Sequence, residues 1–244
     1  MAKGTVLLIG ATSDIARAIG DVYAASGYSL ILAGRNTEEL EQNATDYSIR
    51  HEVECQALHL DVCHFEKHQA IIDSLPELAG VICVAGFMVE NEDAFTNWQL
   101  GKQTVDTNYS GCVSILNLIA ATFKERNSGW IVGISSVAGD RGRGSNFMYG
   151  SAKAGFTAYL SGLRNYLQPF GVHVLTVKPG FVDTKMTEHL DLPKPLTAQP
   201  MQVAKSVFKA QQKGKNILYT LWMWKWVMLI IRNIPEGIFK KLKL

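Results

Sequence analysis

Short apolar runs alternate with longer segments of helical periodicity over the first three quarters of the chain. The apolar runs cover residues 5–9, 28–33, 53–60, 81–85, 130–134 and 172–177. Segments with helical spacing lie between or after them, over residues 15–25, 38–48, 68–74, 105–126 and 149–166. Strands that are apolar throughout are typical of a parallel sheet covered on both faces. The pattern therefore predicts an α/β domain with a doubly wound parallel sheet and helices on both faces.

The last quarter of the chain departs from this alternation. Three prolines between Pro193 and Pro200 predict a loop, and a helix is expected over residues 201–211. After Gly214, residues 217–231 are almost wholly apolar and contain three of the five tryptophans. We expect one domain over residues 1–216, followed by an apolar and basic extension over residues 217–244 that is not a separate domain.

Composition narrows the possible partners and the cellular location. The chain has 244 residues, of which 47% are hydrophobic and 19% charged, enough to build a large core. A net charge of +2 is too small to indicate nucleic acid binding. No secretory segment precedes the first strand, and four cysteines without paired spacing favour reduced thiols, which predicts a cytoplasmic protein.

A group of histidines and cysteines near residue 60 superficially resembles a metal site. Its members are Cys55, His59, Cys63, His64 and His68. The pattern changes from strand to helix within this segment, so the side chains should point in different directions. We therefore expect no metal site, because tetrahedral ligation needs converging ligands.

The turn after the first predicted strand suits a phosphate group. Gly10 allows a sharp turn, and the N-terminus of the following helix offers free N–H groups and a positive dipole end. The candidate coenzyme contacts are Gly10, Thr12, Ser13, Asp14 and Ile15. Asp14 stands where such loops usually carry glycine, and a carboxylate repels phosphate, so we expect its side chain to cap the helix. A plain strand–helix turn is equally compatible with this loop taken alone.

Three further strand ends supply candidate coenzyme contacts. Arg35 follows the second strand, where an acidic residue usually selects NAD and an arginine accommodates the extra phosphate of NADP. Arg35 therefore favours NADP, with a solvated surface arginine as the alternative. Asp61 and Val62 close the third strand and are expected beside the adenine. Ala85 and Gly86 close the fourth and allow the backbone to approach the coenzyme.

Four residues form a candidate catalytic group. Tyr149 and Lys153 are four positions apart on a predicted helix and share one face. A phenol ordinarily ionises near pH ~10, but a neighbouring ammonium and a positive nicotinamide ring favour the phenolate. Ser136, at the end of a strand, can stabilise charge that develops on a carbonyl oxygen. Asn108 can tie Lys153 to a water relay.

Each of these residues also has a simpler structural interpretation. A tyrosine and a lysine one turn apart usually belong to an ordinary helix face, Ser136 can merely end a strand, and Asn108 can be a core amide. Their order, their spacing and their place at the carboxyl ends of predicted parallel strands favour the catalytic interpretation, because ligands bind at that edge of open α/β sheets.

With these residues the chain resembles the short-chain dehydrogenase/reductase family. The matches are the altered Gly10 to Ala16 loop, Asp61, Ala85, Gly86, Asn108, Ser136, Tyr149, Lys153, Pro179, Gly180 and Thr184. Cys83 and Val84 replace the two asparagines usual before Ala85. The resemblance implies a single Rossmann-like domain that uses NADP or NAD and commonly forms dimers or tetramers.

The same resemblance implies residue roles. Ser136, Tyr149 and Lys153 would form a catalytic triad, with Asn108 as a fourth member. Pro179 and Gly180 would contact the coenzyme, and Val182 and Thr184 would lie beside the nicotinamide carboxamide.

The apolar and basic extension, residues 217–244, indicates what kind of substrate the protein binds. Residues 217–231 are shorter than the roughly 20 residues that a spanning helix needs. Tryptophans with a basic flank suit a segment that lies in a membrane interface. Burial in an oligomer, or coverage of the substrate cleft, is the alternative.

A narrower resemblance points in the same direction. Residues 139–141, 145–151 and 227–242 look like the corresponding segments of the decaprenylphosphoryl-keto-pentose reductases, which reduce the 2-keto sugar of a polyprenyl-phosphate pentose. It implies a lipid-linked keto-sugar as substrate, at the inner face of the plasma membrane. Arg141 and Arg143 are then candidates to meet the lipid phosphate, with ordinary surface charge equally compatible. Those reductases are associated with NADH, so the coenzyme stays open despite Arg35.

Two other functions remain compatible with the sequence. One is reduction of a soluble ketone, sterol or acyl substrate, with the tail used in oligomer contacts. The other is a dinucleotide-binding scaffold without activity, which the intact Ser136, Tyr149 and Lys153 disfavour.

Overall fold

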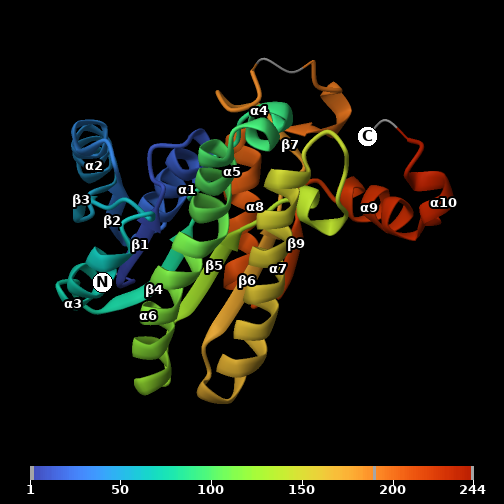
Figure 1. Ribbon diagram of the computed structural model, residues 1–244. Coiled ribbons are helices and arrows are strands. Elements are labelled where there is room, and N and C mark those ends of the chain that lie inside the picture. The colour runs from blue at the N-terminus through green and yellow to red at the C-terminus, as the bar shows by residue number, and fades with distance from the viewer. Residues whose placement is uncertain (1–2, 189–190, 243–244) are drawn as a thin grey trace.

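A sheet of seven parallel strands runs through the centre of the computed structural model, which describes residues 3–188 and 191–242 (Figure 1). In sheet order the strands are β3 (Cys55–His59), β2 (Ser29–Gly34), β1 (Thr5–Ile9), β4 (Leu78–Cys83), β5 (Trp130–Ile134), β6 (His173–Lys178) and β9 (Ile217–Tyr219). The chain winds outward in both directions from the β1–β4 pair. The predicted doubly wound parallel sheet is confirmed. Both ends of the chain and residues 189–190 lie outside the described part, including the last two residues of the expected extension 217–244.

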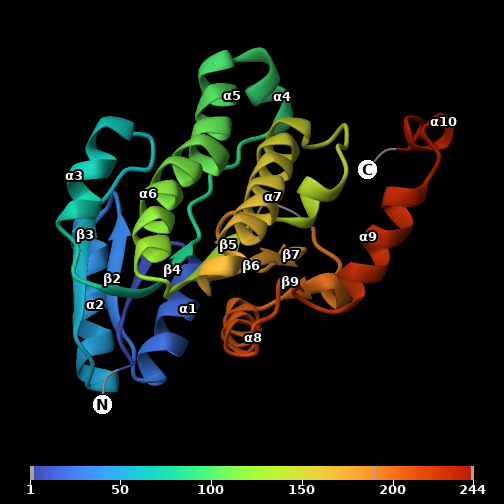
Figure 2. The same ribbon diagram turned by 90° about the horizontal axis from the view of Figure 1, so that it is seen from below.

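Helices cover both faces of this sheet (Figure 2). One face carries α1 (Asp14–Ala25), α2 (Thr37–His51) and α8 (Pro200–Gln212), and the other carries α3 (His68–Asp73), α6 (Gly111–Glu125) and α7 (Phe147–Leu167). Short elements complete the connections: η1 (Phe65–Lys67), α4 (Asn91–Thr96), α5 (Trp98–Val105), η2 (Asp106–Ser110), η3 (Val137–Asp140), η4 (Gln168–Phe170), β7 (Phe181–Val182), η5 (Lys194–Leu196) and β8 (Thr197–Ala198).

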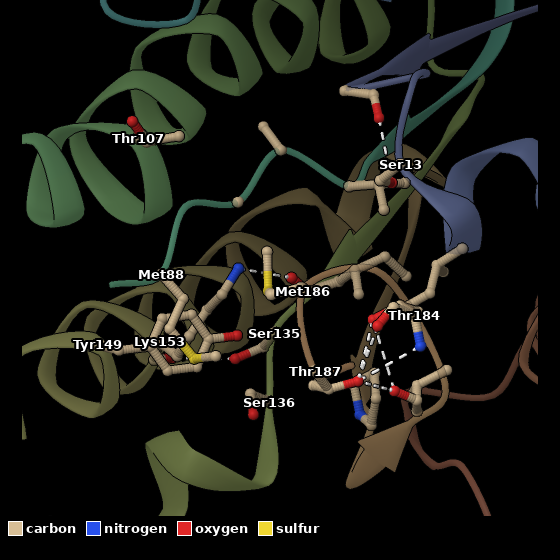
Figure 3. Close-up of a pocket in the computed structure, with 18 of the residues that line it drawn as sticks. Ser13, Met88, Thr107, Ser135, Ser136, Tyr149, Lys153, Thr184, Met186 and Thr187 are labelled. Atoms are coloured by element: carbon tan, nitrogen blue, oxygen red, sulfur yellow. Dashed lines mark hydrogen bonds between the residues drawn. The ribbon is translucent and has the colours of Figure 1, made fainter. Parts of the chain in front are cut away.

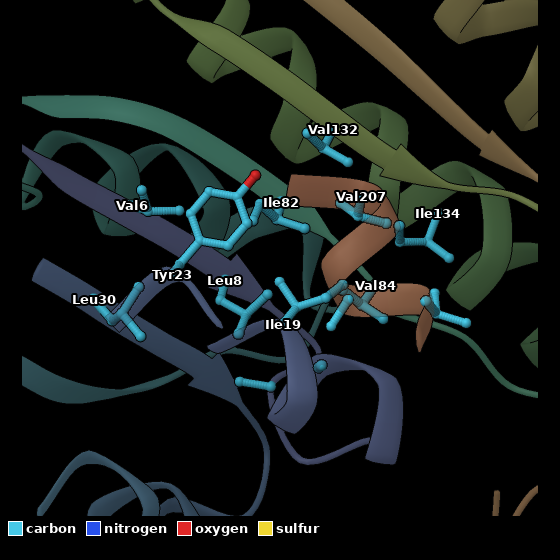
Figure 4. Close-up of a cluster of buried hydrophobic side chains, with 14 of the residues drawn as sticks. Val6, Leu8, Ile19, Tyr23, Leu30, Ile82, Val84, Val132, Ile134 and Val207 are labelled. Atoms are coloured by element: carbon cyan, nitrogen blue, oxygen red, sulfur yellow. The ribbon is translucent and has the colours of Figure 1, made fainter. Parts of the chain in front are cut away.

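Alternation along the strands divides the core into two halves. Val6 and Leu8 of β1 are buried in the cluster that includes Ile19 of α1, which Figure 4 shows. Leu7 between them lies in the opposite cluster, with Ile115 of α6. Because successive side chains of a strand point to opposite faces, a strand that is apolar at every position must be covered on both sides. The continuous apolar runs therefore predicted the layer arrangement correctly.

The helix expected over residues 105–126 is longer and is interrupted. Helix α5 leads directly into η2, a π-helical turn at Asp106–Ser110, and then into α6. Helices α4 and α5 were not predicted, because they pack against α7 rather than lying along the sheet and so carry no long apolar stripe. The π turn contains the candidate residue Asn108, and such turns occur frequently at functional sites.

The tail begins within the sheet and then leaves it. Ile217–Tyr219, the first residues of the expected extension, form β9 and pair with β6. Helices α9 (Met223–Asn233) and α10 (Glu236–Phe239) then project from that edge of the molecule (Figures 1 and 2). Trp224 and Met228 of α9 are buried against η3, whereas Trp226 and Ile230 are exposed. Within the described residues, no helix has both the length and the apolar character needed to cross a membrane.

Candidate active site

A cavity of about 430 Å³ lies at the carboxyl ends of the parallel strands (Figure 3). Seventeen of the proposed catalytic and coenzyme residues line it: Gly10, Thr12, Ser13, Asp14, Ile15, Arg35, Asp61, Val62, Ala85, Gly86, Ser136, Tyr149, Lys153, Pro179, Gly180, Val182 and Thr184. Asn108 does not line it. The structure thus brings the coenzyme candidates and three of the four catalytic candidates into one cavity.

The turn between β1 and α1 requires glycine at its first position. Gly10 has φ +79°, and a Cβ there would lie 2.7 Å from the backbone nitrogen of Ala85. The helix is capped by Ser13, whose hydroxyl accepts a hydrogen bond from the Ala16 N–H at 3.3 Å. The expectation that Asp14 caps the helix is wrong, because Asp14 is already inside the helix and Ser13 occupies the N-cap position.

Asp14 instead connects the phosphate turn to the loop after β7. Its carboxylate accepts a hydrogen bond from Arg17 at 2.5 Å and another from the backbone N–H of Lys185 at 2.9 Å. Partial burial opposes ionisation, but these bonds outweigh it and hold the pKa of the Asp14 carboxyl below its ordinary value. The negative charge beside the phosphate turn is therefore balanced locally by Arg17.

Tyr149 and Lys153 lie on the same side of α7, as predicted from their spacing. The ammonium of Lys153 is 5.7 Å from the centroid of the Tyr149 ring, and it donates a hydrogen bond to the Ile134 carbonyl at 3.2 Å. Lys153 is 3% exposed. The hydroxyl of Ser135 donates to the Lys153 carbonyl at 3.0 Å and ties α7 to the end of β5. A buried cation is thus held next to a phenol that faces the cavity.

Ser136 and Asn108 approach the same region from different elements. The Ser136 hydroxyl lies at the cavity wall and accepts a hydrogen bond from the Ala138 N–H at 3.1 Å. Asn108, in the π turn, is fully buried, and its amide donates to the Phe87 carbonyl at 2.6 Å. A Cβ on Gly86 would lie 3.4 Å from the Asn108 Oδ1 and 3.8 Å from the Lys153 Nζ. Asn108 therefore lies behind the cavity wall close to Lys153, and its link to a water relay stays a prediction.

Trp224 of α9 was not predicted as a site residue. It lines the cavity, packs edge-on against Phe181 with ring centroids 5.2 Å apart, and donates a hydrogen bond from Nε1 to the Leu196 carbonyl at 3.0 Å. The sequence offered cleft coverage by the tail as an alternative, but it gave no signal for which tryptophan turns inward. One face of the tail helix is thus a wall of the cavity.

Arg141 holds the tail in place and does not reach the cavity. Its guanidinium donates to the carbonyls of Ile231 and Ile234, both at 2.6 Å, and to Glu236 at 2.9 Å. It also stacks 3.6 Å from the centroid of the Phe239 ring. The expectation that Arg141 meets a substrate phosphate is therefore wrong, because the unpaired carbonyls at the end of α9 occupy its donors. Arg143, by contrast, lines the cavity.

A buried ion pair supports the segment that follows Ser136. The Lys178 Nζ of β6 and the Asp140 Oδ1 of η3 are 2.5 Å apart, with 7% and 3% of these side chains exposed. The hydroxyl of Tyr219 donates to the other oxygen of Asp140 at 2.7 Å. Burial, followed by the bond to the Asp140 carboxylate, raises the pKa of Tyr219. Strands β6 and β9 thereby fix the position of η3.

The residues present suit a dinucleotide. The Gly10 turn leaves no side chain between the end of β1 and the backbone at Ala85, and α1 begins at the cavity with its positive end. Arg35, which is exposed at the rim, supplies a cation at the end of β2. The glycine turn and the helix end are the features that bind a pyrophosphate in dinucleotide folds, and Arg35 adds positive charge at the rim.

A protein-family model described as short chain dehydrogenase matches residues 4–194. The chain belongs to this family. The enzyme is accordingly an oxidoreductase that uses a nicotinamide dinucleotide. An uncharacterized oxidoreductase of Mycobacterium tuberculosis is 31% identical over 241 residues, covering 97% of this chain and 96% of that protein.

Two further similarities place this dehydrogenase among its relatives. Sulfoacetaldehyde reductase 2 of Chromohalobacter salexigens is 34% identical over 191 residues, covering 75% of this chain and 74% of that enzyme. A solved short-chain dehydrogenase from Sphingobium yanoikuyae in complex with NADPH has a TM-score of 0.83 and 19% identity, covering 96% of this chain and 97% of the other. The structural similarity supports the fold.

Proposed function

We propose that this dehydrogenase reduces a ketone to a secondary alcohol, with Tyr149 as the proton donor. The observation that carries the proposal is the placement of Ser136, Tyr149 and Lys153 in the cavity that also contains the Gly10 turn. A scaffold that merely binds a dinucleotide needs the turn but not the other three side chains. Adding a ketone and reduced coenzyme to the folded protein and following nicotinamide absorbance tests the proposal, and absence of oxidation with every ketone contradicts it.

The proposed chemistry divides the work among three side chains. A bound nicotinamide coenzyme supplies the hydride to the carbonyl carbon. Tyr149 donates its hydroxyl proton to the carbonyl oxygen as negative charge develops there, a contribution typically worth ~10²–10⁴-fold in rate. Ser136 donates a hydrogen bond to the same oxygen and stabilises that charge. The product alcohol leaves with both hydrogens, and Tyr149 is left as a phenolate.

Lys153 and Asn108 assist the return of a proton to the Tyr149 phenolate. The Lys153 ammonium, 5.7 Å from the Tyr149 ring centroid, stabilises the phenolate through its charge. Its burial strengthens that effect, because the local dielectric is lower than that of water. Asn108 holds the backbone at Phe87 and keeps the wall next to Lys153 in place. We propose that a proton returns to Tyr149 from solvent through this region.

NADP is the proposed coenzyme, with NAD as the alternative. Arg35 lines the cavity at the end of β2, where the 2′-phosphate of NADP would lie, and a guanidinium binds phosphate through charge-assisted hydrogen bonds. Measured dissociation constants for NADPH and NADH distinguish the two coenzymes.

For the substrate we propose the keto-sugar of a polyprenyl phosphate, taken from the surface of an anionic membrane. The outer face of α9 exposes Trp226, Leu229 and Ile230 at 51–67% of their surface, and its Lys225 and Arg232 add positive charge. The inner face of the same helix contributes Trp224 to the cavity. A single helix thus offers an apolar, basic face for lipid and a wall for the reacting group.

A vesicle-binding experiment tests this tail. The variant Trp226→Ser/Leu229→Ser/Ile230→Ser should lose flotation with phosphatidylglycerol vesicles, whereas Trp98→Ser, which changes an even more exposed tryptophan on α5, should not. Removing the whole tail is unsuitable, because β9 belongs to the sheet and Trp224 to the cavity. If the triple variant floats with the vesicles as well as the wild type does, membrane contact through α9 is contradicted. The formation of a dimer or tetramer is a separate prediction. The molar mass from light scattering tests it.

A soluble carbonyl compound is the second candidate substrate. The similarity to sulfoacetaldehyde reductase 2, an enzyme named for a small anionic aldehyde, supports it. This candidate predicts full activity on a small carbonyl compound without any dependence on vesicles or detergent, whereas the lipid-linked substrate predicts activity that rises with vesicle concentration.

A further inference from the structure

Two buried polar atoms in the cavity have no hydrogen-bond partner among the described residues. They are the Nε of Arg143 and the Oδ1 of Asn146. Both residues line the cavity together with Ser136 and Tyr149. Buried donors and acceptors are nearly always satisfied in folded proteins, because leaving one unpaired costs free energy. A polar ligand bound in the cavity can therefore supply the missing hydrogen-bond partners of these two atoms.

The free oxygen of Asn146 is unexpected from its position in the fold. Asn146 is the N-cap residue of α7, where an asparagine usually accepts a hydrogen bond from the first turn of the helix. Here Asn91 does this instead, accepting from the Met148 N–H at 3.2 Å and donating to the Gly144 carbonyl at 3.5 Å. The helix is capped from outside, and the Asn146 side chain stays available in the cavity.

Arg143 has an unpaired buried donor, whereas its near neighbour Arg141 has partners for its guanidinium. The guanidinium of Arg141 is occupied by backbone carbonyls of the tail and by Glu236. Burial without a compensating charge lowers the pKa of Arg143, which still remains a cation at neutral pH. Among the described residues Arg143 forms no ion pair: of the two carboxylates that line the cavity, Asp14 pairs with Arg17, and Asp61 accepts a hydrogen bond from the Cys63 N–H at 2.9 Å.

We propose that Arg143 and Asn146 form the substrate-recognition site, and that the substrate is a hydroxylated ketone that carries an anionic group, most simply a phosphorylated keto-sugar. Arg143 donates hydrogen bonds to the anionic oxygens, and the Asn146 Oδ1 accepts one from a substrate hydroxyl. The inference rests on the proposed ketone reduction at this site. The anion can be the phosphodiester of a lipid carrier or a free sugar phosphate, since both present anionic, non-bridging phosphate oxygens to Arg143.

A matched pair of small ketones tests the arginine. Wild-type enzyme should reduce dihydroxyacetone phosphate with a higher kcat/KM than dihydroxyacetone. Arg143→Gln should lower the ratio of kcat/KM for dihydroxyacetone phosphate to kcat/KM for dihydroxyacetone by about tenfold or more, mainly through KM for the phosphorylated ketone. Arg143→Lys should recover part of the loss, because it keeps the charge but not the forked geometry. Lys194→Gln, which removes an exposed cation outside the cavity, should leave both values unchanged.

Asn146 is tested with hydroxylated and plain ketones. Asn146→Ser should lower the ratio of kcat/KM for dihydroxyacetone to kcat/KM for acetone severalfold. Because Asn91 caps α7, the melting temperature should change little. An equal loss with both ketones contradicts hydroxyl recognition by Asn146.

A binding measurement separates this inference from the proposed reaction. Calorimetric titration of dihydroxyacetone phosphate into enzyme saturated with oxidised coenzyme requires no turnover. Binding at least about tenfold weaker in Arg143→Gln supports the inference, even if neither ketone is reduced and the proposed function fails. Reduction of both ketones with equal losses in Arg143→Gln, or no binding to the wild-type enzyme, overturns the inference. A polyprenyl-phosphate keto-pentose in vesicles then identifies the source of the anion, since it should compete better than the soluble phosphate if the lipid is the carrier.

Discussion

The indole of Trp224 lies against Gly180, and a methyl group on Gly180 would overlap it. This contact joins the tail helix α9 to the segment that follows β6 and enters the cavity. Packing against Trp224 thus requires glycine at position 180, and the tail cannot move without opening one wall of the cavity.

Gly180→Ala should therefore loosen the tail. Overpacking of this kind costs about 1–3 kcal/mol, which should appear as a lower free energy of unfolding in urea and as faster proteolysis within α9. Gly162→Ala is the matched control, because Gly162 lies within α7 with open space around it. That change should raise stability by roughly 0.5–1 kcal/mol. Unaltered stability and proteolysis in Gly180→Ala would contradict the described contact.

Lys178→Met should be strongly destabilising. It leaves the Asp140 carboxylate buried without its counter-charge, at a cost of about 3–5 kcal/mol. The double variant Lys178→Met/Asp140→Leu should recover a large part of that loss, since no isolated charge remains. Urea denaturation of the two single variants and the double variant measures the coupling, and additive losses would show that the pair is not energetically linked.

Asp14→Asn should tighten coenzyme binding. Asparagine can still accept the hydrogen bond from the Lys185 N–H, but it no longer repels a pyrophosphate. The gain should be at most about fivefold in dissociation constant, corresponding to ~1 kcal/mol for a solvated pair of charges, because Arg17 already offsets part of the repulsion. Isothermal titration with NADPH at neutral pH measures it.

The same carboxylate predicts a dependence on pH. The pKa of Asp14 is lowered in the folded protein, so its bonds stabilise the fold above its ordinary value of 3.8 and are lost as the pH falls through the lowered pKa. Asp14→Asn should remove this part of the acid dependence of stability. Identical acid unfolding of the variant and the wild type would contradict a contribution from Asp14.

Arg35→Ser should weaken the binding of NADPH by about tenfold and leave that of NADH nearly unchanged. A hydrogen bond to a charged group is worth about 1.5–3 kcal/mol, and the 2′-phosphate that would receive it is absent from NADH. Comparison of the two dissociation constants in both proteins is the measurement. Equal losses for the two coenzymes would contradict the assignment of Arg35 to the phosphate.

The sequence predicted what depends on local pattern. Continuous apolar runs indicated the buried parallel strands, and the spacing of Tyr149 and Lys153 placed them on one helix face. It could not distinguish Arg141 from Arg143, two residues apart in the same loop, because their environments differ through contacts with α9, about ninety residues away. Trp224 was missed for the same reason, since its inward orientation is set by Gly180.

The central claim, proton donation by Tyr149, is tested most directly by Tyr149→Phe. The substitution keeps the ring beside Lys153 and removes the hydroxyl alone. The dissociation constant for reduced coenzyme should stay within about twofold, and kcat for ketone reduction should fall by ~10²–10⁴-fold. Turnover by Tyr149→Phe at a rate near that of the wild type would contradict that claim.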